Sequence, residues 1–212
     1  MYSIRGTASM DRAWSTSDGR ARVVTDSPPR VLFVCTANLV RSPIAAALLE
    51  TRLHENAPDV VVESAGLRET DATLDDGALL VLDQQGVDLR GHQSRPIDPA
   101  MVGTATLVLG LEREHVREAV LLDPSIWPRT FTLKEIVRRG EEEGPRQHGE
   151  SISEWIARAH TGRSQRDLLG ANRADDVADP YGGSPGEYEE AAEEIDDLVA
   201  RLVSLLWPEG RM

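Results

Sequence analysis

The sequence predicts an α/β fold, a three-layer sandwich with a central four-stranded parallel sheet and helices on both faces. Short apolar runs rich in Val, Leu and Phe alternate with helix-like stretches along residues 30–133, which is the order that a parallel sheet requires. The first apolar run ends in a Cys-x5-Arg loop, from Cys35 to Arg41, and a helix start follows it at once. The 212 residues suffice for one such domain of ordinary size.

Four apolar runs are the expected strands, and the stretches between and after them are the expected helices. The strands are expected at residues 30–35, 60–64, 104–111 and 127–133. The helices are expected at residues 43–56, 74–85, 112–120, 151–160 and 185–206. Ser42-Pro43 and Ser184-Pro185 each place a good N-cap residue before a proline at the first helical position, so both predict sharp helix starts.

The two ends of the chain and one internal segment fall outside this pattern. Residues 1–29 are polar, lack periodicity and end in two prolines, so we expect a disordered leader or a start codon assigned too early. Residues 30–207 are expected to form one domain, followed by a tail at residues 208–212. Residues 134–175 are expected to be an insertion, whose charged first part, residues 134–150, includes a mobile loop. This insertion either borders the mouth of the functional site or is a peripheral subdomain.

Charge and composition exclude several classes of function. The formal net charge of −13 argues against binding nucleic acids or anionic membranes through bulk electrostatics. No apolar run approaches the roughly 18 residues of a membrane-spanning helix, and the N-terminus lacks the apolar core of a secretory signal. A single cysteine excludes an internal disulfide and fits the cytoplasm. The five histidines lack metal-ligand spacing, which predicts surface or capping roles and no metal site.

The loop from Cys35 to Ser42 predicts an anion site with a nucleophile at its base. Such a loop can point successive backbone N–H groups inward, and the following helix N-terminus adds its positive dipole end. Arg41 adds a planar fork of donors for phosphoryl oxygens, and a thiol in that field favours the thiolate. Ser42 can donate to the thiolate or cap the helix, and Asn38 tolerates left-handed backbone angles. The alternative is that Cys35 is a small buried apolar residue at a strand end.

A second segment, Asp179-Pro180-Tyr181, supplies what thiolate attack on a phosphate monoester also needs. The leaving oxygen must take up a proton, and an acid on a separate loop, such as Asp179, can provide it. Pro180 stiffens this loop, and Tyr181 can form an aromatic wall of the substrate cleft. A plain turn is the alternative interpretation.

Together these segments resemble the low-molecular-weight protein tyrosine phosphatases. The resemblance rests on VLFVCTANLVRSPIAA, then ESAG, then DPYGG before a last amphipathic helix, over roughly residues 30–207 apart from the insertion. The segment LEREHVREAVLLDPSIWPRTFTL also looks like the corresponding region of actinobacterial members. The resemblance implies a cytoplasmic hydrolase, a monomer or weak dimer, that acts on phosphotyrosine-containing proteins without metal or organic cofactor.

The resemblance also implies a role for each matching residue. Cys35 becomes the nucleophile, Arg41 the phosphate clamp, and Asp179 the general acid that later acts as base. Asn38, Ser42 and Ser64 support the loop, while Leu39 and Tyr181 line the substrate cleft. The loop residues expected to bind phosphate are Thr36, Ala37, Asn38, Leu39, Val40, Arg41 and Ser42.

Two loop residues bear on which function is favoured. Ala37 stands where the family usually has glycine, so the backbone angles of the loop become a test. Leu39 stands where phosphoarginine phosphatases on this scaffold commonly have threonine, and an apolar side chain suits an aromatic leaving group better than a guanidinium.

Phosphotyrosine phosphatase is therefore the favoured function. Phosphoarginine phosphatase, small-thiol-coupled arsenate reductase and a catalytically weak phosphate-binding relative are the alternatives. The lack of further cysteines excludes the thioredoxin-coupled reductase route, and Pro43, where reductases of this fold often have glutamine, disfavours arsenate reduction in general.

The single cysteine generates a first prediction. Many family members carry a second cysteine at the position of Val40, able to form a protective disulfide with the nucleophile, and this chain cannot do so. We therefore expect peroxide to carry Cys35 past the sulfenic acid to sulfinic and sulfonic forms that reductant does not restore. Titration of free thiol after peroxide and then dithiothreitol checks this; full recovery after a high peroxide dose would contradict it.

Overall fold

A computed structural model of the chain describes residues 28–54, 57–84, 90–169 and 173–208. All but the last two residues of the expected leader, and the expected tail beyond residue 208, lie outside this part of the chain. Among the described residues, no helix combines the length and the apolar character needed to cross a membrane.

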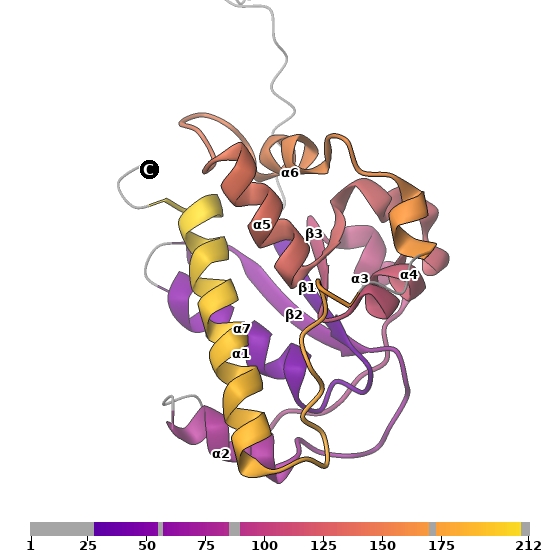
Figure 1. The fold of residues 1–212 in the computed structure, drawn as a ribbon, viewed down its shortest axis with the longest axis vertical. Coiled ribbons are helices and arrows are strands. Elements are labelled where there is room, and N and C mark those ends of the chain that lie inside the picture. The colour runs from indigo at the N-terminus through magenta and orange to yellow at the C-terminus, as the bar shows by residue number, and fades with distance from the viewer. Residues whose placement is uncertain (1–27, 55–56, 85–89, 170–172, 209–212) are drawn as a thin grey trace, which may run out of the picture.

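The centre of the fold is a four-stranded sheet in which every pairing is parallel, as predicted (Figure 1). Its strands follow the order β2-β1-β3-β4. Their bounds are Arg30–Cys35 for β1, Val61–Gly66 for β2, Leu107–Gly110 for β3 and Thr130–Thr132 for β4. Cys35 at the end of β1 pairs with Gly66 at the end of β2. The carboxyl ends of the strands therefore meet at one edge of the sheet, where the site is expected.

Helices cover both faces of the sheet, which completes the predicted three-layer sandwich (Figure 1). One apolar core includes residues of α1 (Arg41–Leu53), α2 (Asp76–Gln84), α5 (Leu133–Glu143), α6 (Ile152–His160) and α7 (Pro185–Leu206). The other includes residues of α3 (Pro99–Thr104), α4 (Arg113–Leu122) and two 3-10 helices, Pro124–Arg129 and Gln165–Leu169.

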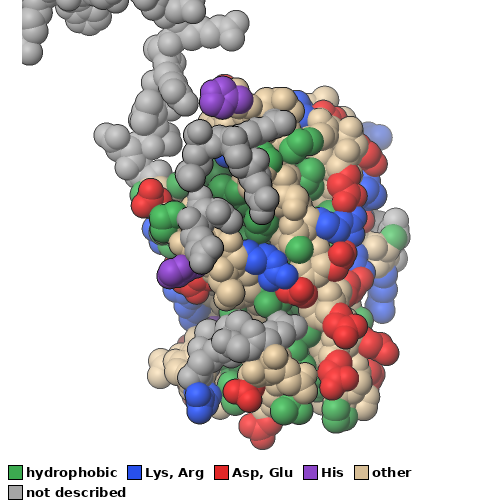
Figure 2. All heavy atoms as spheres, turned by 90° about the vertical axis from the view of Figure 1, so that its left-hand side faces the viewer, with side chains coloured by type: hydrophobic (Ala, Val, Ile, Leu, Met, Phe, Trp, Pro, Cys, Tyr) green, Lys and Arg blue, Asp and Glu red, His purple; other side chains and the backbone are tan. Residues whose placement is uncertain are grey.

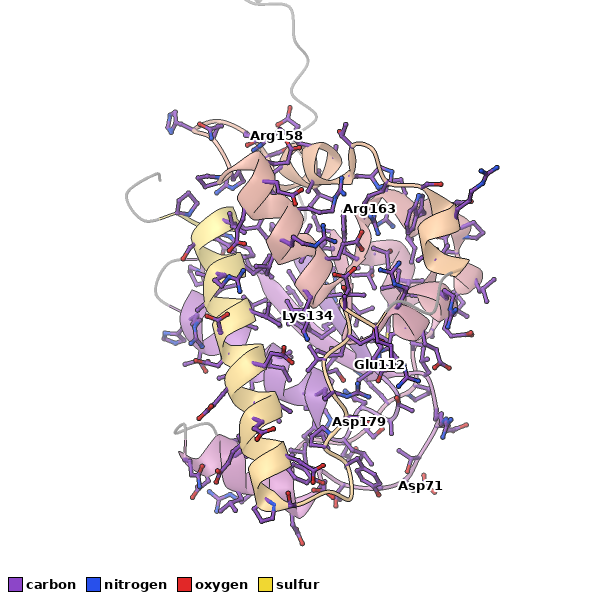
Figure 3. The ribbon with its side chains drawn as sticks, in the orientation of Figure 1. Asp71, Glu112, Lys134, Arg158, Arg163 and Asp179 are labelled. Carbon is purple, nitrogen blue, oxygen red and sulfur yellow. The ribbon has the colours of Figure 1, made fainter. Side chains whose placement is uncertain are left out.

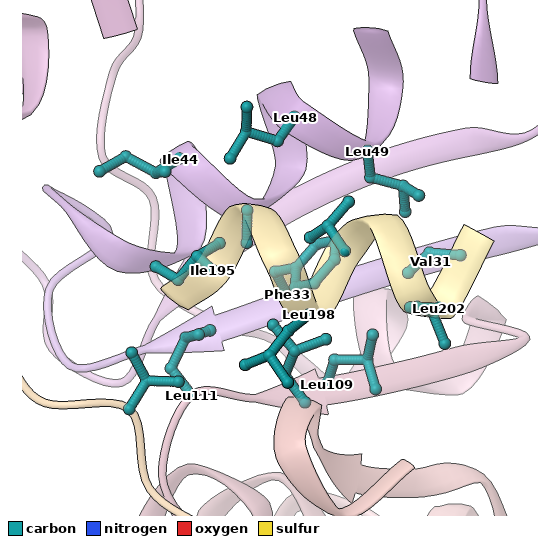
Figure 4. Close-up of a cluster of buried hydrophobic side chains, with 14 of the residues drawn as sticks. Val31, Phe33, Ile44, Leu48, Leu49, Leu109, Leu111, Ile195, Leu198 and Leu202 are labelled. Atoms are coloured by element: carbon teal, nitrogen blue, oxygen red, sulfur yellow. The ribbon is translucent and has the colours of Figure 1, made fainter. Parts of the chain in front are cut away.

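Strand β1 is buried on both faces. Val31, Phe33 and Cys35 belong to the core on the side of α1 and α7, whereas Leu32 and Val34 belong to the opposite core. Figure 4 shows Phe33 among side chains of α1, β3 and α7. Because both faces are covered, the strand reads in the sequence as a continuous apolar run, and each fully buried large side chain contributes about 1.5–3 kcal/mol.

Helix α7 begins where the sequence predicts. Ser184 precedes it, and the Ser184 backbone N–H and hydroxyl donate to Glu187 Oε2 at 2.7 and 2.9 Å, which completes a capping box. The apolar side chains along one side of the helix are buried, namely Tyr188, Ala192, Ile195, Leu198, Val199, Leu202, Leu205 and Leu206.

Ion pairs attach the charged side of α7 to its neighbours. Arg52 of α1 lies 2.6 Å from Asp196, and Lys134 of α5 lies 2.6 Å from Glu194. Figure 2 shows acidic and basic side chains intermixed over one face of the molecule. Such exposed pairs contribute about 0–1 kcal/mol each, so the apolar face of α7 holds the helix in place.

Helix α5, which was not predicted, occupies the first part of residues 134–150, which were expected to include a mobile loop. The helix extends through residue 143, and the irregular part is confined to residues 144–150. Leu133, Ile136 and Val137 are buried at helical spacing, while the charged side chains between them stay at least partly exposed. The many charged residues of this stretch obscured the helical spacing of its few apolar residues in the sequence.

Strands β3 and β4 are both shorter than predicted, because helical turns occupy the residues before them. Helix α3, which was not predicted, ends at Thr104, and Asp98 caps its start by accepting from the Met101 N–H at 2.9 Å. A 3-10 helix fills Pro124–Arg129 before β4. Val, Leu and Trp residues next to the strands in sequence are also buried, because the helical turns that carry them pack into the core. The length of an apolar run therefore overestimates the length of the strand.

The expected insertion, residues 134–175, is firmly attached to the outer strand β4. The Arg163 guanidinium lies 4.0 Å from the Trp127 ring and 3.8 Å from the Phe131 ring. Its Nε also donates to Glu135 at 2.8 Å, and its side chain is 2% exposed (Figure 3). A buried arginine held by two aromatic faces and a carboxylate fixes this segment to the sheet edge. That this segment is an insertion stays a prediction.

Candidate active site

The Cys35 thiol lies at the start of the loop between β1 and α1. Its sulfur accepts the Asn38 N–H at 3.2 Å and the Ser42 hydroxyl at 3.0 Å. The N-terminus of α1 begins six residues later, at Arg41. Two donors and a helix dipole therefore favour negative charge on the sulfur. Cys35 is buried, but it also lines a surface pocket. Its surroundings are therefore not those of a purely apolar core residue, which was the alternative interpretation.

Ser42 supports the thiol and does not cap the helix. Val40 occupies the N-cap position and provides no side-chain cap, and Ser42 lies inside the first turn. Its hydroxyl contacts the Cys35 sulfur and also receives a hydrogen bond from Asn38 Nδ2 at 3.0 Å. Of the two uses expected for Ser42, the structure places it in contact with the thiol.

Asn38 shapes the loop. Its φ of 55° is left-handed, and its side chain is fully buried. Its amide Nδ2 donates to Ser42 and also to Ser64 Oγ at 2.9 Å, while its Oδ1 accepts the Arg95 N–H at 3.2 Å. Ser64 thus lies behind the loop, where a supporting residue was expected. One asparagine joins the loop to β2 and to the chain segment before α3.

The position that needs glycine is Gly66, not Ala37. Asn38 is the one non-glycine residue with positive φ in the described part of the chain, so Ala37 carries no left-handed strain. A Cβ added to Gly66 would lie 2.7 Å from the Ala37 carbonyl carbon and 2.8 Å from the Asn38 nitrogen. The loop crosses directly over β2, and the missing side chain of Gly66 makes room for it.

Residues 92–95 brace the loop from outside, and sequence reasoning missed them. The His92 ring Nε2 donates to the Asn38 carbonyl at 3.0 Å, and the Ser94 hydroxyl donates to the Ala37 carbonyl at 2.6 Å. Arg95 Nε donates to the Ser64 carbonyl at 2.9 Å. With its carbonyls held outward, the loop keeps its N–H groups available on the inner side. Single polar residues in a loop carried no signal of this role.

Arg41 joins the loop to two distant carboxylates. Its Nη2 donates to Asp179 Oδ2 at 2.7 Å, and its Nη1 donates to Glu112 and, at 3.0 Å, to the Val177 carbonyl. The Arg41 side chain is 1% exposed, so its charge is compensated inside the protein. The structure thus brings Asp179 to the loop, 138 residues away in sequence, as predicted for a shared site. Glu112 was not predicted.

His115 is a capping histidine, but a buried one. Its Nδ1 accepts the Glu112 N–H at 2.9 Å, so the ring proton lies on Nε2, which donates to Thr36 Oγ1 at 3.2 Å. Burial, and then repulsion by the Arg41 charge, lower the pKa of His115 to about 3. A neutral His115 therefore orients both Glu112 and Thr36 around Arg41.

The loop after β1, Arg41 and Asp179 border one pocket of about 340 Å³, a size suited to a small ligand. The predicted cleft residues Leu39 and Tyr181 both line this pocket, and Tyr181 is 60% exposed to solvent. No residue of the described part of segment 134–175 contributes to the lining, and the role of this segment stays a prediction. The lining residues are Cys35, Thr36, Ala37, Leu39, Val40, Arg41, Arg68, Glu69, Thr70, Asp179 and Tyr181. Across the described residues, no group of three or more His, Cys, Asp or Glu side chains is placed to hold a metal ion.

Comparison with known proteins gives one consistent result. A family model described as low molecular weight phosphotyrosine protein phosphatase matches residues 30–144, which include the loop and α5. A protein-arginine-phosphatase of Geobacillus stearothermophilus is 31% identical over 86% of this chain and 99% of its own length. The low molecular weight protein-tyrosine-phosphatase Etp of Escherichia coli K12 is 31% identical over 59% of this chain and 83% of its own length.

Solved structures agree with these matches. The YwlE arginine phosphatase from Geobacillus stearothermophilus aligns with a TM-score of 0.62 at 31% identity, covering 84% of this chain and 92% of that one. A low molecular weight protein tyrosine phosphatase from T. tengcongensis aligns with a TM-score of 0.63 at 27% identity, covering 84% of this chain and 99% of that one.

The crossing at Gly66 gives a testable prediction. Gly66→Ala forces the loop backbone away from β2, so we expect the free energy of unfolding to fall by about 1–3 kcal/mol and Cys35 alkylation by iodoacetamide to slow. Ala37→Gly is the control, because it removes a methyl group at a position without positive φ; it should cost less than about 1 kcal/mol. Urea unfolding and alkylation rates check this, and a larger effect at Ala37 than at Gly66 would contradict it.

The burial of His115 predicts a pH dependence of stability. The unfolded chain takes up a proton on His115 near pH 6.5 and the folded chain near pH 3, so stability is lost as the pH falls through this window. Between pH 7 and 5 we expect wild type to lose about 2 kcal/mol more than His115→Gln. Denaturant unfolding of both proteins at the two pH values measures the difference; identical losses would refute the assignment.

Proposed function

Because the chain belongs to the family of low molecular weight phosphotyrosine protein phosphatases, we propose that it removes phosphate from phosphotyrosine in proteins through a phosphocysteine at Cys35. The observation that carries the proposal is the single pocket that contains the Cys35 thiol, the Arg41 fork and the Asp179 carboxylate. A nucleophile, a clamp for phosphoryl oxygens and an acid for the leaving group are the parts that this chemistry needs.

In the first step, the Cys35 thiolate attacks phosphorus and the bond from phosphorus to the substrate oxygen breaks. Asp179 in its acid form donates its proton to that oxygen, and the phenol leaves. Loop N–H groups from Thr36 to Arg41 bind the phosphoryl oxygens, and the Ser42 hydroxyl, 3.0 Å from the sulfur, stabilises the thiolate before attack.

In the second step, water attacks the phosphocysteine. Asp179, now a carboxylate, takes a proton from that water, the sulfur–phosphorus bond breaks, and inorganic phosphate is released with the thiolate restored. The same residue thus acts first as acid and then as base.

Arg41 must exchange partners during this cycle. Its Nη2 is held by Asp179 at 2.7 Å, and phosphoryl oxygens compete for that nitrogen. Its Nη1 stays held by Glu112 and the Val177 carbonyl. Substrate binding therefore releases Asp179 toward the leaving group while half of the guanidinium keeps its position.

The pocket walls favour an aromatic leaving group. Leu39 and Val40 are apolar and line the pocket, and the Tyr181 ring can stack against a phosphotyrosine ring. We propose on this basis that phosphotyrosine is preferred. The single cysteine, which fits a reducing compartment, supports the further proposal that the enzyme acts in the cytoplasm.

Phosphoarginine is the second candidate. The relative that matches over 99% of its own length is named a protein-arginine-phosphatase, and the Glu69 and Asp179 carboxylates in the lining could pair with a guanidinium. Leu39 in place of threonine is the residue that argues against it.

The proposed roles predict the effect of two substitutions. Cys35→Ser should abolish hydrolysis of aryl phosphates, because the alkoxide it would need is not formed at neutral pH. Asp179→Asn should lower kcat/KM by roughly 10²–10⁴-fold with a poor leaving group. Steady-state assays with phenyl phosphate measure both. Equal, negligible rates in wild type and Cys35→Ser would refute the proposed phosphatase activity. An unchanged rate in Asp179→Asn would refute the role of Asp179 as general acid.

Substrate choice is settled by turnover of peptides that differ in the phosphorylated residue. The wild type is compared on phosphotyrosine, phosphoarginine and phosphoserine peptides, with Cys35→Ser as the trap that retains bound substrate. Faster turnover of phosphoarginine would reject the preference drawn from Leu39.

A further inference from the structure

The loop that carries Asp179 is anchored on both sides of the carboxylate. On the N-terminal side, the Val177 N–H donates to the Leu111 carbonyl at 2.8 Å, and the Val177 carbonyl accepts from Arg41. On the C-terminal side, the Gly182 N–H donates to the hydroxyl of Tyr188 at 3.1 Å. Tyr188 lies in the first turns of α7, so the second anchor comes from a helix and not from the loop itself.

Tyr188 is itself rigidly placed. It is 5% exposed, and its ring lies against Gly77 of α2, where an added Cβ would be 2.7 Å from the ring. Asp75 borders the same cavity as Tyr188, and burial together with the Asp75 carboxylate raises the pKa of Tyr188 to about 12. The hydroxyl therefore stays protonated at neutral pH, and its oxygen accepts from the Gly182 N–H.

Gly182 and Gly183 have no side chains that could hold this turn on the side of Tyr188. Gly182 and Gly183 border a cavity of about 270 Å³ between the loop, α2 and α7, which Asp75 and Tyr188 also line. Gly182 has a φ of 75°, and the turn is closed by the Gly183 N–H donating to the Pro180 carbonyl at 2.8 Å. The turn after Asp179 thus has its own hydrogen bond, and the Tyr188 hydroxyl adds a hydrogen bond from the turn to the helix.

We propose that Tyr188 is a positioning residue for the general acid: its ring is fixed against Gly77, and its hydroxyl, bonded to the Gly182 N–H, holds Asp179 within reach of the leaving oxygen. This inference rests on the proposed function. Tyr188 does not touch the substrate pocket, so it acts through the placement of Asp179 alone. Its effect must therefore depend on how much the leaving group needs a proton.

Tyr188→Phe tests this, because it removes the hydroxyl and keeps the ring against Gly77. The readout is kcat/KM for phenyl phosphate, whose leaving group needs protonation, and for 2,4-dinitrophenyl phosphate, whose leaving group does not. We expect a fall of about threefold to tenfold for phenyl phosphate, the rate equivalent of one lost hydrogen bond, and of less than about twofold for the dinitrophenyl ester. Ser204→Ala removes a hydroxyl from the outer side of α7, whose partner is the Ala200 carbonyl, and should change neither rate.

A double-mutant cycle separates positioning from general stability. In an Asp179→Asn background, Tyr188→Phe should produce no further fall with phenyl phosphate, because the acid it positions is already lost. An equal fall for both esters, an additive fall in that background, or no fall at all would overturn the inference. Failure of the proposed function looks different, since wild type would then hydrolyse neither ester faster than Cys35→Ser.

Discussion

The left-handed, fully buried Asn38 is the constraint on which the site depends. Its backbone turns the loop so that its own N–H meets the Cys35 sulfur, and its side-chain amide connects the loop to Ser42 and Ser64. Asparagine tolerates this backbone conformation better than most residues because its short amide can satisfy its own surroundings. The crossing over Gly66 depends on the same turn, since a straighter loop would not approach β2 so closely.

Arg41 presents the converse problem, a charge that the proposed function needs and that is costly to bury. Removing a charge from water costs several kcal/mol unless partners compensate it, and here Glu112, Asp179, Thr36 and a carbonyl share that task. In a protein with a net charge of −13, a dianionic phosphate is attracted by a local arrangement of donors and not by the overall field. The site therefore separates holding the arginine, through Glu112 and Val177, from the exchangeable contact with Asp179.

The mechanism and the positioning of Asp179 follow the same division of labour. Rigid groups hold the parts that must not move: His115 and Glu112 for Arg41, residues 92–95 for the loop carbonyls, and Tyr188 for the turn after Asp179. The carboxylate of Asp179 itself is 41% exposed, which leaves it able to exchange between Arg41 and a leaving group. Preorganised donors with one movable acid are what electrostatic catalysis of this type requires.

The sequence by itself determined the features that local pattern can carry. Apolar runs alternating with helices indicated the parallel sheet, Ser184-Pro185 marked the start of α7, and Cys35, Arg41 and Asp179 were found because each lies in a motif of adjacent residues. Its errors have local causes too: charged residues concealed α5, and a serine before a proline was taken for a helix cap.

Tertiary structure alone decided the rest. Parallel strands bring the loops at their carboxyl ends to one edge of the sheet, and α7 packs beside them. This arrangement places several supporting residues around the site, namely Gly66, residues 92–95, Glu112, His115 and Tyr188. Even where such a residue lies in a recognisable segment, as Gly66 does in ESAG, periodicity and spacing do not reveal what it contacts. Contacts between residues tens of positions apart depend on how the chain crosses over, and that is fixed when the whole core packs.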